Sequence, residues 1–198
     1  MSQKIIIADL DGCFSDDRER RHLLPDMHSA RPFPLTEVDF HAYHEGLEDD
    51  SAINWAQVQS AILSGHHIAF ITARPDAYEM PTLRWLHRKW PALNGASFGL
   101  HMRPKGDLRS SPELKVALFE EEPDYKWEDV VAAYDDREDV LMAYAAKGVR
   151  ALYNATENGI ARLTNTGPQV SEPFDVYAYD DAPISKPEPI KFHASRFT

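Results

Sequence analysis

Two aspartates separated by one residue, Asp9 and Asp11, follow an apolar run and are the first side chains in this sequence with a pattern suited to chemistry. Paired carboxylates can hold a divalent cation through hard oxygen ligands, or act as a nucleophile beside a proton donor. Residues two apart in a strand point the same way, so the pair is expected to share one site if the strand continues to Asp11. The alternative is a strand that ends in an ordinary Asx turn.

The element that must position this pair is the run Lys4-Ile-Ile-Ile-Ala, which is apolar from Ile5 to Ala8 and contains three β-branched residues. A continuous apolar run of this kind is typical of a strand covered on both faces, as in a parallel sheet. Gly12 then allows a sharp turn. The sequence therefore predicts that a buried strand delivers both carboxylates to its carboxyl end.

Two later apolar runs also end in polar side chains: residues 67–71 run into Thr72, and residues 130–134 run into Asp135-Asp136. Weaker strands are predicted at 96–102 and 149–153, and helices at 52–63, 76–90, 112–122 with Ser111 as its N-cap, and 140–146. This alternation predicts an α/β fold, a Rossmann-like three-layer parallel sheet, whose ligand site lies outside the carboxyl ends of the strands.

Residues 16–50 are charged, rich in His and Pro, and too long for a plain loop, so a small cap insertion after the first strand is expected there. Beyond Gly167, prolines recur and break any regular pattern. The expected organisation is one domain over residues 1–167, followed by a Pro-rich tail over residues 168–198.

Composition narrows the classes of function. The 43% hydrophobic content suffices for a core, and the formal net charge of −11 disfavours broad, sequence-independent binding to nucleic-acid backbones. A single cysteine excludes an internal disulfide framework. With no apolar leader or membrane-length run, a cytoplasmic protein without a membrane partner is expected; its oligomeric state is left open.

Four motifs in order, Asp9-Leu-Asp11-Gly12, Thr72 after a strand, Lys115 on a helix and Asp135-Asp136 after another strand, resemble the haloacid dehalogenase (HAD) superfamily over roughly residues 4–153. Within it, Thr-Ala-Arg-Pro at 72–75, Gly-Asp-Leu-Arg at 106–109 and Asp-Asp-Arg at 135–137 resemble the phosphatase domain of phage-type polynucleotide kinases. Two features depart from that pattern. Cys13 stands where relatives usually carry Thr, and no stretch fits the Gly-x4-Gly-Lys-Ser/Thr loop of the kinase half.

The resemblance implies catalytic roles for four residues. Asp9 would attack phosphorus and form an aspartyl phosphate, while Asp11 would protonate the leaving oxygen and then activate water. Thr72 would hydrogen-bond the phosphoryl oxygens, and Lys115 would balance their charge. Without the resemblance, Thr72 is an ordinary hydroxyl at a strand end and Lys115 an ordinary solvated helix residue.

The resemblance also implies Mg²⁺ as the cofactor. Its ligands would be Asp9, the backbone carbonyl of Asp11, and one or both of Asp135 and Asp136, which supply only oxygen donors. One of the last two aspartates can instead cap the following helix.

The substrate is expected to be a nucleotide-type phosphate monoester. Three arginines are candidates for recognising a further phosphate or a base, and three cap residues are candidates for contacting the leaving group: Arg74, Arg103 and Arg109, and His41, Tyr43 and His44. Surface salt bridges and cap packing are the alternatives for these two groups. Phe40 belongs to the same cap segment.

A magnesium-dependent phosphomonoesterase is therefore expected, and the acidic charge slightly favours a free (deoxy)nucleoside monophosphate as its substrate. The resemblance instead favours a 3′-phosphate at a nucleic-acid end. A third hypothesis, from a different class, is a non-catalytic nucleotide-binding module with the same fold.

Overall fold

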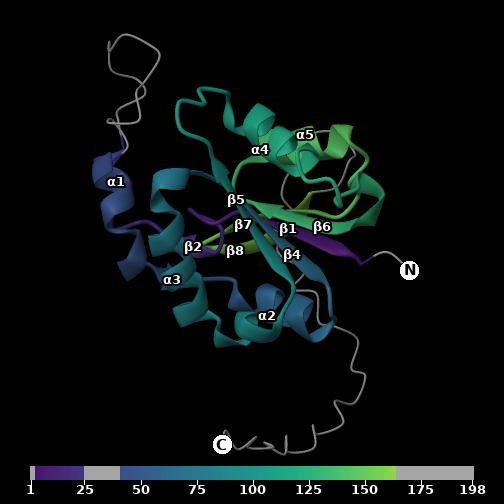
Figure 1. The fold of residues 1–198 in the computed structure, drawn as a ribbon, viewed down its shortest axis with the longest axis horizontal. Coiled ribbons are helices and arrows are strands. Elements are labelled where there is room, and N and C mark those ends of the chain that lie inside the picture. The colour runs from purple at the N-terminus through teal and green to yellow at the C-terminus, as the bar shows by residue number, and fades with distance from the viewer. Residues whose placement is uncertain (1–2, 25–40, 164–198) are drawn as a thin grey trace, which may run out of the picture. The chain divides into compact units, whose positions relative to one another are not determined.

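The computed structural model describes residues 3–24 and 41–163, and its centre is a six-stranded sheet (Figure 1). The first five strands in sheet order run parallel, and the last is antiparallel to its neighbour. In that order the strands are β5 (Phe98–Arg103), β4 (His67–Pro75), β1 (Ile5–Ala8), β6 (Val130–Asp135), β7 (Leu152–Thr156) and β8 (Gly159–Leu163). The predicted α/β class with a parallel sheet is confirmed.

Four helices cover the two faces of the sheet. α2 (Trp55–Leu63) and α3 (Glu79–Lys89) lie on one face, whereas α4 (Ser111–Glu120) and α5 (Glu138–Ala146) lie on the other (Figure 1). Short 3-10 helices complete the connections: η1 (Arg21–Leu23), η3 (Leu47–Asp49), η4 (Asp76–Tyr78), η5 (Pro91–Gly95) and η6 (Trp127–Asp129).

The central strand β1 shows why the sheet is buried on both sides. Ile5 and Ile7 belong to the apolar cluster under α4 and α5, while Ala8 belongs to the cluster under α2 and α3. Alternate residues of a strand face opposite sides, so a continuous apolar run supplies both clusters at once. This burial fixes the register of β1 between β4 and β6, and therefore fixes where the following residues emerge.

Helix α4 begins one residue earlier than the sequence predicted. Its N-cap is Ser110, whose side chain and backbone N–H both reach the Glu113 carboxylate in a capping box. Ser111 is the first helical residue and not the cap. The capping box fixes the start of the helix, so that Lys115 faces the sheet and is buried.

The ends of the predicted insertion are joined by a two-residue antiparallel pair, β2 (Ser15–Asp16) and β3 (Ser51–Ala52), which we call the cap stem. The described part of the insertion contains η1, η3 and α1 (His41–Glu45). Residues 25–40, including Phe40, and the predicted tail over residues 168–198 lie outside the described residues.

The carboxyl-terminal side of the sheet differs from the prediction. The last strand expected, at 149–153, begins at Leu152, and β8 was not predicted. β8 is half-exposed and its residues show little alternation of apolar and polar side chains. The sequence therefore gives only a weak signal for this strand, although it pairs with β7 along its length. Within the described residues, no helix combines the length and hydropathy needed to span a membrane.

Candidate active site

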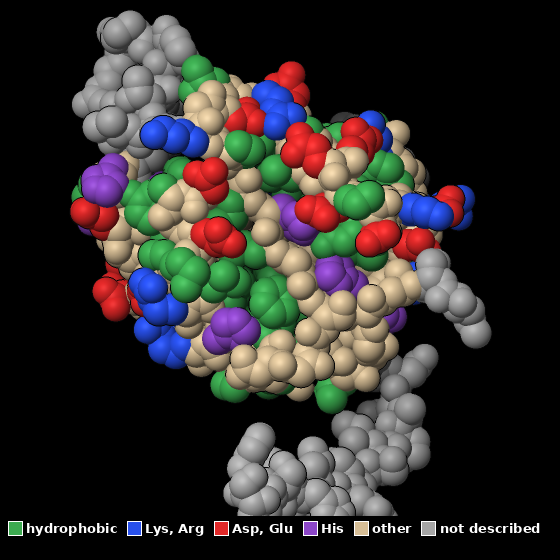
Figure 2. Space-filling view, viewed as in Figure 1, with side chains coloured by type: hydrophobic (Ala, Val, Ile, Leu, Met, Phe, Trp, Pro, Cys, Tyr) green, Lys and Arg blue, Asp and Glu red, His purple; other side chains and the backbone are tan. Residues whose placement is uncertain are grey.

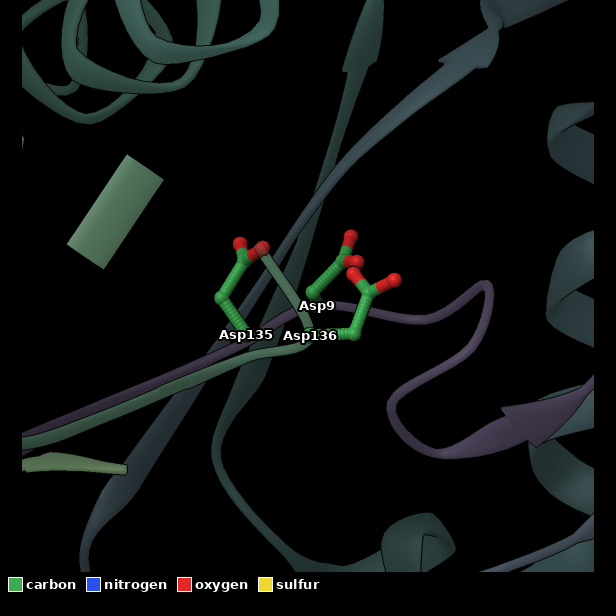
Figure 3. Close-up of side chains that lie close together, drawn as sticks. All are labelled: Asp9, Asp135 and Asp136. Atoms are coloured by element: carbon green, nitrogen blue, oxygen red, sulfur yellow. The ribbon is translucent and has the colours of Figure 1, made fainter. Parts of the chain in front are cut away.

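Three carboxylates meet where two neighbouring strands end. Asp9 directly follows β1, Asp135 is the last residue of β6, and Asp136 comes next. The Asp9 N–H donates to the Tyr134 carbonyl at 3.0 Å, which holds the chain beside β6 past the end of β1. One oxygen of each carboxylate lies within 4.8 Å of the others (Figure 3). The predicted convergence of Asp9 with Asp135 and Asp136 is present in the structure.

Lys115 joins this cluster from helix α4. Its side chain is 2% exposed, and its Nζ lies 2.7 Å from Asp9 Oδ1 and 2.7 Å from Asp135 Oδ2. Burial opposes the charged ammonium, but Asp135 and Asp9 raise the pKa of Lys115 well above its ordinary value. The lysine is therefore a cation fixed against the two most buried carboxylates of the cluster.

Asp9 and Asp136 are the two carboxylates of the cluster whose ionised forms are disfavoured by their surroundings. Burial raises the pKa of Asp9 despite the opposing Lys115, and the carboxylates of Asp135 and Asp136 raise it further. Burial together with Asp135 raises the pKa of Asp136 to about 6. One lysine does not neutralise three carboxylates, so the cluster has the charge and the oxygen donors that suit a divalent cation.

The turn after β1 must come close to Asp136. Gly12 has a φ of +79°, and a Cβ atom at this position would lie 2.8 Å from Asp136 Oδ2. A side chain here would be strained in the backbone and would displace the carboxylate. Gly12 thus allows the turn to pass beside the cluster.

Asp11 does not share its side-chain partners with Asp9, contrary to the expectation of one shared carboxylate site. β1 ends at Ala8, and Asp11 begins the turn that bridges to Ser15. Its carboxylate accepts two hydrogen bonds from Arg74, Nε at 2.9 Å and Nη2 at 2.8 Å, and also pairs with Arg20. Burial opposes ionisation, yet these guanidinium groups hold the pKa of Asp11 well below its usual range.

Thr72 and Arg74 both lie on β4, next to β1. Ala8 pairs with Phe70, so Thr72 lies two residues further along the neighbouring strand, buried at the same edge of the sheet. Its Oγ1 accepts the Arg74 N–H at 3.2 Å. Arg74, predicted to contact substrate, is instead fully buried against Asp11 and Ser15.

Sequence reasoning missed the second guanidinium of this group. Arg20 is buried beneath the cap stem, where it donates to both oxygens of Asp50 and to the Tyr43 carbonyl. Its guanidinium also lies 4.1 Å from the centre of the Tyr43 ring. The only available signal was the charge-rich run at residues 16–21, which reads equally well as a solvated surface.

Arg103 and Arg109 organise the loop between β5 and α4. Arg103 Nη1 donates to the carbonyls of Asp107 and Arg109 at 3.0 and 2.9 Å, and its Nε donates to the Ala73 carbonyl. Arg109 Nε donates to the Asp107 carboxylate at 2.8 Å. Both predicted substrate arginines therefore have internal partners, and Arg109 is the more accessible of the two.

The three predicted cap residues differ in their surroundings. His41 is exposed and pairs with the Tyr78 hydroxyl, whereas Tyr43 is buried and donates to the Asp17 carboxylate. His44 is buried, and among the described residues its Nδ1 has no hydrogen-bond partner. Tyr43 thus supports the cap itself, while His41 lies at the surface.

Comparison with solved structures gives resemblances at low identity. A protein in a Pnkp1/Rnl/Hen1 complex is 23% identical (TM-score 0.49), with 79% of this chain and 44% of that chain covered. The putative HAD-hydrolase YfnB from Bacillus subtilis, bound to magnesium, is 14% identical (TM-score 0.49), with 77% and 88% covered. A putative beta-phosphoglucomutase from Thermotoga maritima is 16% identical (TM-score 0.46), with 76% and 84% covered.

The chain thus spans less than half the length of the first of these proteins. Among curated proteins no similar sequence was found. The model of one protein family, described as the phosphatase domain of polynucleotide kinase PNKP, matches residues 3–158, which include every residue of the carboxylate cluster and Lys115. The chain therefore belongs to this family of HAD phosphatase domains.

Proposed function

We propose that this domain is a magnesium-dependent phosphomonoesterase in which Asp9 is the nucleophile. The observation that carries the proposal is the position of Lys115, whose ammonium touches both the Asp9 carboxylate and the Asp135 carboxylate at 2.7 Å. It holds one Asp9 oxygen in a fixed direction and supplies positive charge where a phosphate would approach. A non-catalytic binding module has no need for a buried nucleophile oriented in this way.

The carboxylate cluster fits a magnesium ion by the chemistry of its donors. Asp9, Asp135 and Asp136 offer oxygen atoms alone, and burial makes their mutual repulsion costly unless a cation offsets it. When bound, magnesium would neutralise charge between the anionic nucleophile and the dianionic phosphate. The Asp11 carboxylate is engaged with arginines, so only its backbone carbonyl remains as a candidate ligand.

The proposed reaction has two steps. An Asp9 oxygen attacks phosphorus as the bond to the leaving oxygen breaks, and the leaving oxygen takes a proton from Asp11. Water then attacks the aspartyl phosphate, gives its proton to Asp11 and releases phosphate from Asp9. Thr72, at the same sheet edge, is the candidate donor to the phosphoryl oxygens.

Asp11 can act as the acid only after it gains a proton, and its arginine contacts oppose this. In the structure it is the ionised partner of Arg74 and Arg20, which favours the carboxylate over the acid. Its role as an acid therefore requires substrate to weaken one of these contacts. Arg20 is the candidate to move, since it belongs to the cap insertion, while Arg74 is fixed on β4.

The family match favours a polynucleotide 3′-phosphate as the substrate over a free nucleoside monophosphate, which reverses the slight preference drawn from charge. The mononucleotide stays as the second candidate, because the net charge of −11 opposes long acidic ligands. Both substrates place a ribose or deoxyribose next to the phosphate, so the same chemistry serves either one.

Phosphate release separates these hypotheses. The protein is incubated with magnesium and with a 5′-mononucleotide, a 3′-mononucleotide, a 3′-phosphorylated oligonucleotide or an aryl phosphate, and each reaction is repeated in chelator. The proposal expects turnover that chelator abolishes, with the highest kcat/KM for the 3′-phosphorylated oligonucleotide. Full activity in chelator would remove magnesium from the mechanism, and no turnover of any substrate would favour the binding module.

A further inference from the structure

Asn54 has an unusual backbone and an unusual use of its side chain. It is the one non-glycine residue with a positive φ among the described residues, at φ 52° and ψ 26°. It also occupies the N-cap position of α2, where asparagine normally bonds the first turn of the helix, yet it makes no such bond. Both features cost stability locally, so the side chain is expected to have another role.

The amide of Asn54 instead joins two loops. Its Nδ2 donates to the Cys13 carbonyl at 2.7 Å and to the Thr156 carbonyl at 3.0 Å. Cys13 follows Gly12 in the turn beside the carboxylate cluster, and Thr156 ends β7. The neighbouring Ile53 N–H donates to the Phe14 carbonyl, so the same turn is held at two successive carbonyls.

A second asparagine continues this chain of contacts. Asn154, two residues before Thr156 on β7, donates its Nδ2 to the Asp136 carbonyl at 2.9 Å. The turn after Asp9 and the turn that carries Asp136 are thus connected through Asn54, a short piece of β7 and Asn154. No other side chain in the described residues donates to either the Cys13 or the Asp136 carbonyl.

We propose that Asn54 and Asn154 are positioning residues that act in series and set the separation between the Gly12–Cys13 turn and Asp136. Neither touches the reacting groups directly. The inference rests on the proposed function for its kinetic consequences, but the geometry it concerns is that of the carboxylate cluster itself. Asn54 lies at the point where the chain leaves the cap stem and enters α2, so it also links the cap to this spacing.

Two substitutions separate the role of the backbone from that of the amide. Asn54→Gly retains free access to positive φ but removes both hydrogen bonds. Asn54→Asp retains the size and the tolerance for this conformation, but it places a carboxylate against two carbonyl oxygens. If the amide is what matters, both variants should lower kcat by about 10-fold or more and change KM less, since small displacements of reacting groups are costly.

The control is Val58→Ala, which removes buried methyl groups from α2 in the same apolar cluster but leaves both hydrogen bonds of Asn54 in place. Magnesium affinity by calorimetry and amide hydrogen exchange of residues 12–15 are measured alongside kinetics. We expect weaker magnesium binding and faster exchange in both Asn54 variants and neither effect in Val58→Ala. In the double variant Asn54→Asp/Asn154→Ala, the fold-loss in kcat should be smaller than the product of the fold-losses in the two single variants, because both substitutions interrupt the same connection.

Wild-type kinetics and exchange in both Asn54 variants would overturn the proposal and leave only a backbone role. Equal losses in Val58→Ala would show general damage to α2, which also overturns it. If the wild-type protein hydrolyses no substrate, the proposed function fails. Exchange in residues 12–15 then decides the positioning role: unchanged exchange in the variants would refute it, and faster exchange would support it.

Discussion

Lys115 is the buried cation that partly offsets the charge of the carboxylate cluster. Buried ammonium and carboxylate groups are costly to desolvate, and removing one partner leaves the other charge uncompensated. Here one lysine serves two carboxylates, and the third, Asp136, lies beside Gly12 without a lysine of its own. The distribution of charge therefore leaves a deficit of positive charge on the side where magnesium is proposed to bind.

Replacing the proposed nucleophile, Asp9, should remove turnover and preserve the fold. Asp9→Asn keeps the shape of the side chain but cannot readily form an acyl phosphate, so kcat should fall by about 10³-fold or more. The matched control is Asp129→Asn, which neutralises a buried carboxylate paired with Lys4 at 2.9 Å, just before β6 and so at the other end of that strand from Asp135. Steady-state hydrolysis of an aryl phosphate compares the two, and near-normal activity of Asp9→Asn would refute the assignment.

Neutralising Asp136 should have opposite effects on stability and on metal binding. Because burial and Asp135 raise its pKa to about 6, ionised Asp136 destabilises the metal-free protein near pH 7. Asp136→Asn should therefore raise the free energy of unfolding in chelator by about 1–3 kcal/mol at pH 7. The folded state holds the proton more tightly than the unfolded state, so this gain should be small near pH 4, grow between pH 4 and pH 6, and level off above pH 6.

Thermal unfolding with and without magnesium tests this prediction. The ion should stabilise the wild-type protein more than Asp136→Asn, since the variant lacks one ligand. A variant that is less stable in chelator and responds equally to magnesium would show that Asp136 is a structural group.

The site residues that follow strands could be predicted from the sequence, whereas those that the cap insertion places next to Asp11 could not. Asp9, Thr72 and Asp135-Asp136 come directly after apolar runs, and the carboxyl ends of parallel strands must meet at one edge. Arg20 and Asp50 carry no such signal, because their burial depends on how the cap stem folds over Asp11. The separation of Asp11 from Asp9 was missed for a related reason, since the strand ends three residues before Asp11.

At the scale of elements, the cap stem is held to the core by buried charges. Arg20 pairs with both Asp11 and Asp50, and Asp50 also accepts the Ser15 hydroxyl. Arg74 contributes from β4. This network connects the insertion to the proposed proton-transfer group and explains why a two-residue strand pair can close the base of the cap.

Breaking that network should be costly and non-additive. Arg20→Met leaves the buried Asp50 with only the more distant guanidinium of Arg74, at 3.9 Å, and should lower the free energy of unfolding by about 3–5 kcal/mol. Asp50→Asn should also lower the free energy of unfolding. The loss in the double variant Arg20→Met/Asp50→Asn should be smaller than the sum of the two single losses by about 1 kcal/mol or more. Urea denaturation of the four proteins gives the interaction energy. Strict additivity would mean that the two residues do not interact.

Helix α1 introduces a pH dependence through His44. Burial, together with the nearby Arg74 and Arg20 and against the pull of Asp11, lowers the pKa of His44 to about 4. The unfolded state binds a proton below pH 6.5 and the folded state does not, so stability should fall between pH 6.5 and pH 4. This group should contribute a loss of about 2 kcal/mol between pH 7 and pH 5.

The pH dependence of the wild-type protein is compared with that of His44→Gln, whose amide side chain does not titrate between pH 4 and pH 7. Urea denaturation at pH 5 and pH 7 should show a smaller difference for the variant than for the wild-type protein. Identical differences would mean that His44 is protonated equally in the folded and unfolded states.

For the whole molecule, periodicity was enough to predict the succession of strands and helices along the chain and a parallel sheet, but not the antiparallel edge strand. Strands β1, β4 and β6 are buried on both faces and leave continuous apolar runs. β8 is an edge strand with no fully buried residue, and its two exposed residues, Ala161 and Arg162, are adjacent, so its place follows from pairing with β7 and not from a pattern of its own. The four helices that cover the sheet were predicted to within a few residues because each turns an apolar face toward the sheet, with apolar residues at helical spacing, whereas α1 in the cap was not predicted.

Net charge leads to a prediction about how a polynucleotide substrate is bound. The chain carries a formal charge of −11, and on the face drawn in Figure 2 the described basic side chains are interspersed with acidic ones rather than gathered in a stripe. Extended nucleic-acid binding gains affinity by replacing counterions along a basic track, and weakens as salt increases. Recognition here should depend on the terminal nucleotides instead.

We therefore expect kcat/KM for 3′-phosphorylated oligonucleotides to stop rising beyond a few nucleotides of length. For a longer oligonucleotide, an increase in ionic strength should leave kcat/KM unchanged or raise it, because salt screens repulsion between the acidic protein and distant phosphates. A 3′-mononucleotide measured over the same salt series controls for effects on the chemistry. A steep loss of kcat/KM with salt that is confined to the long oligonucleotide would reveal a basic track and contradict end-only recognition.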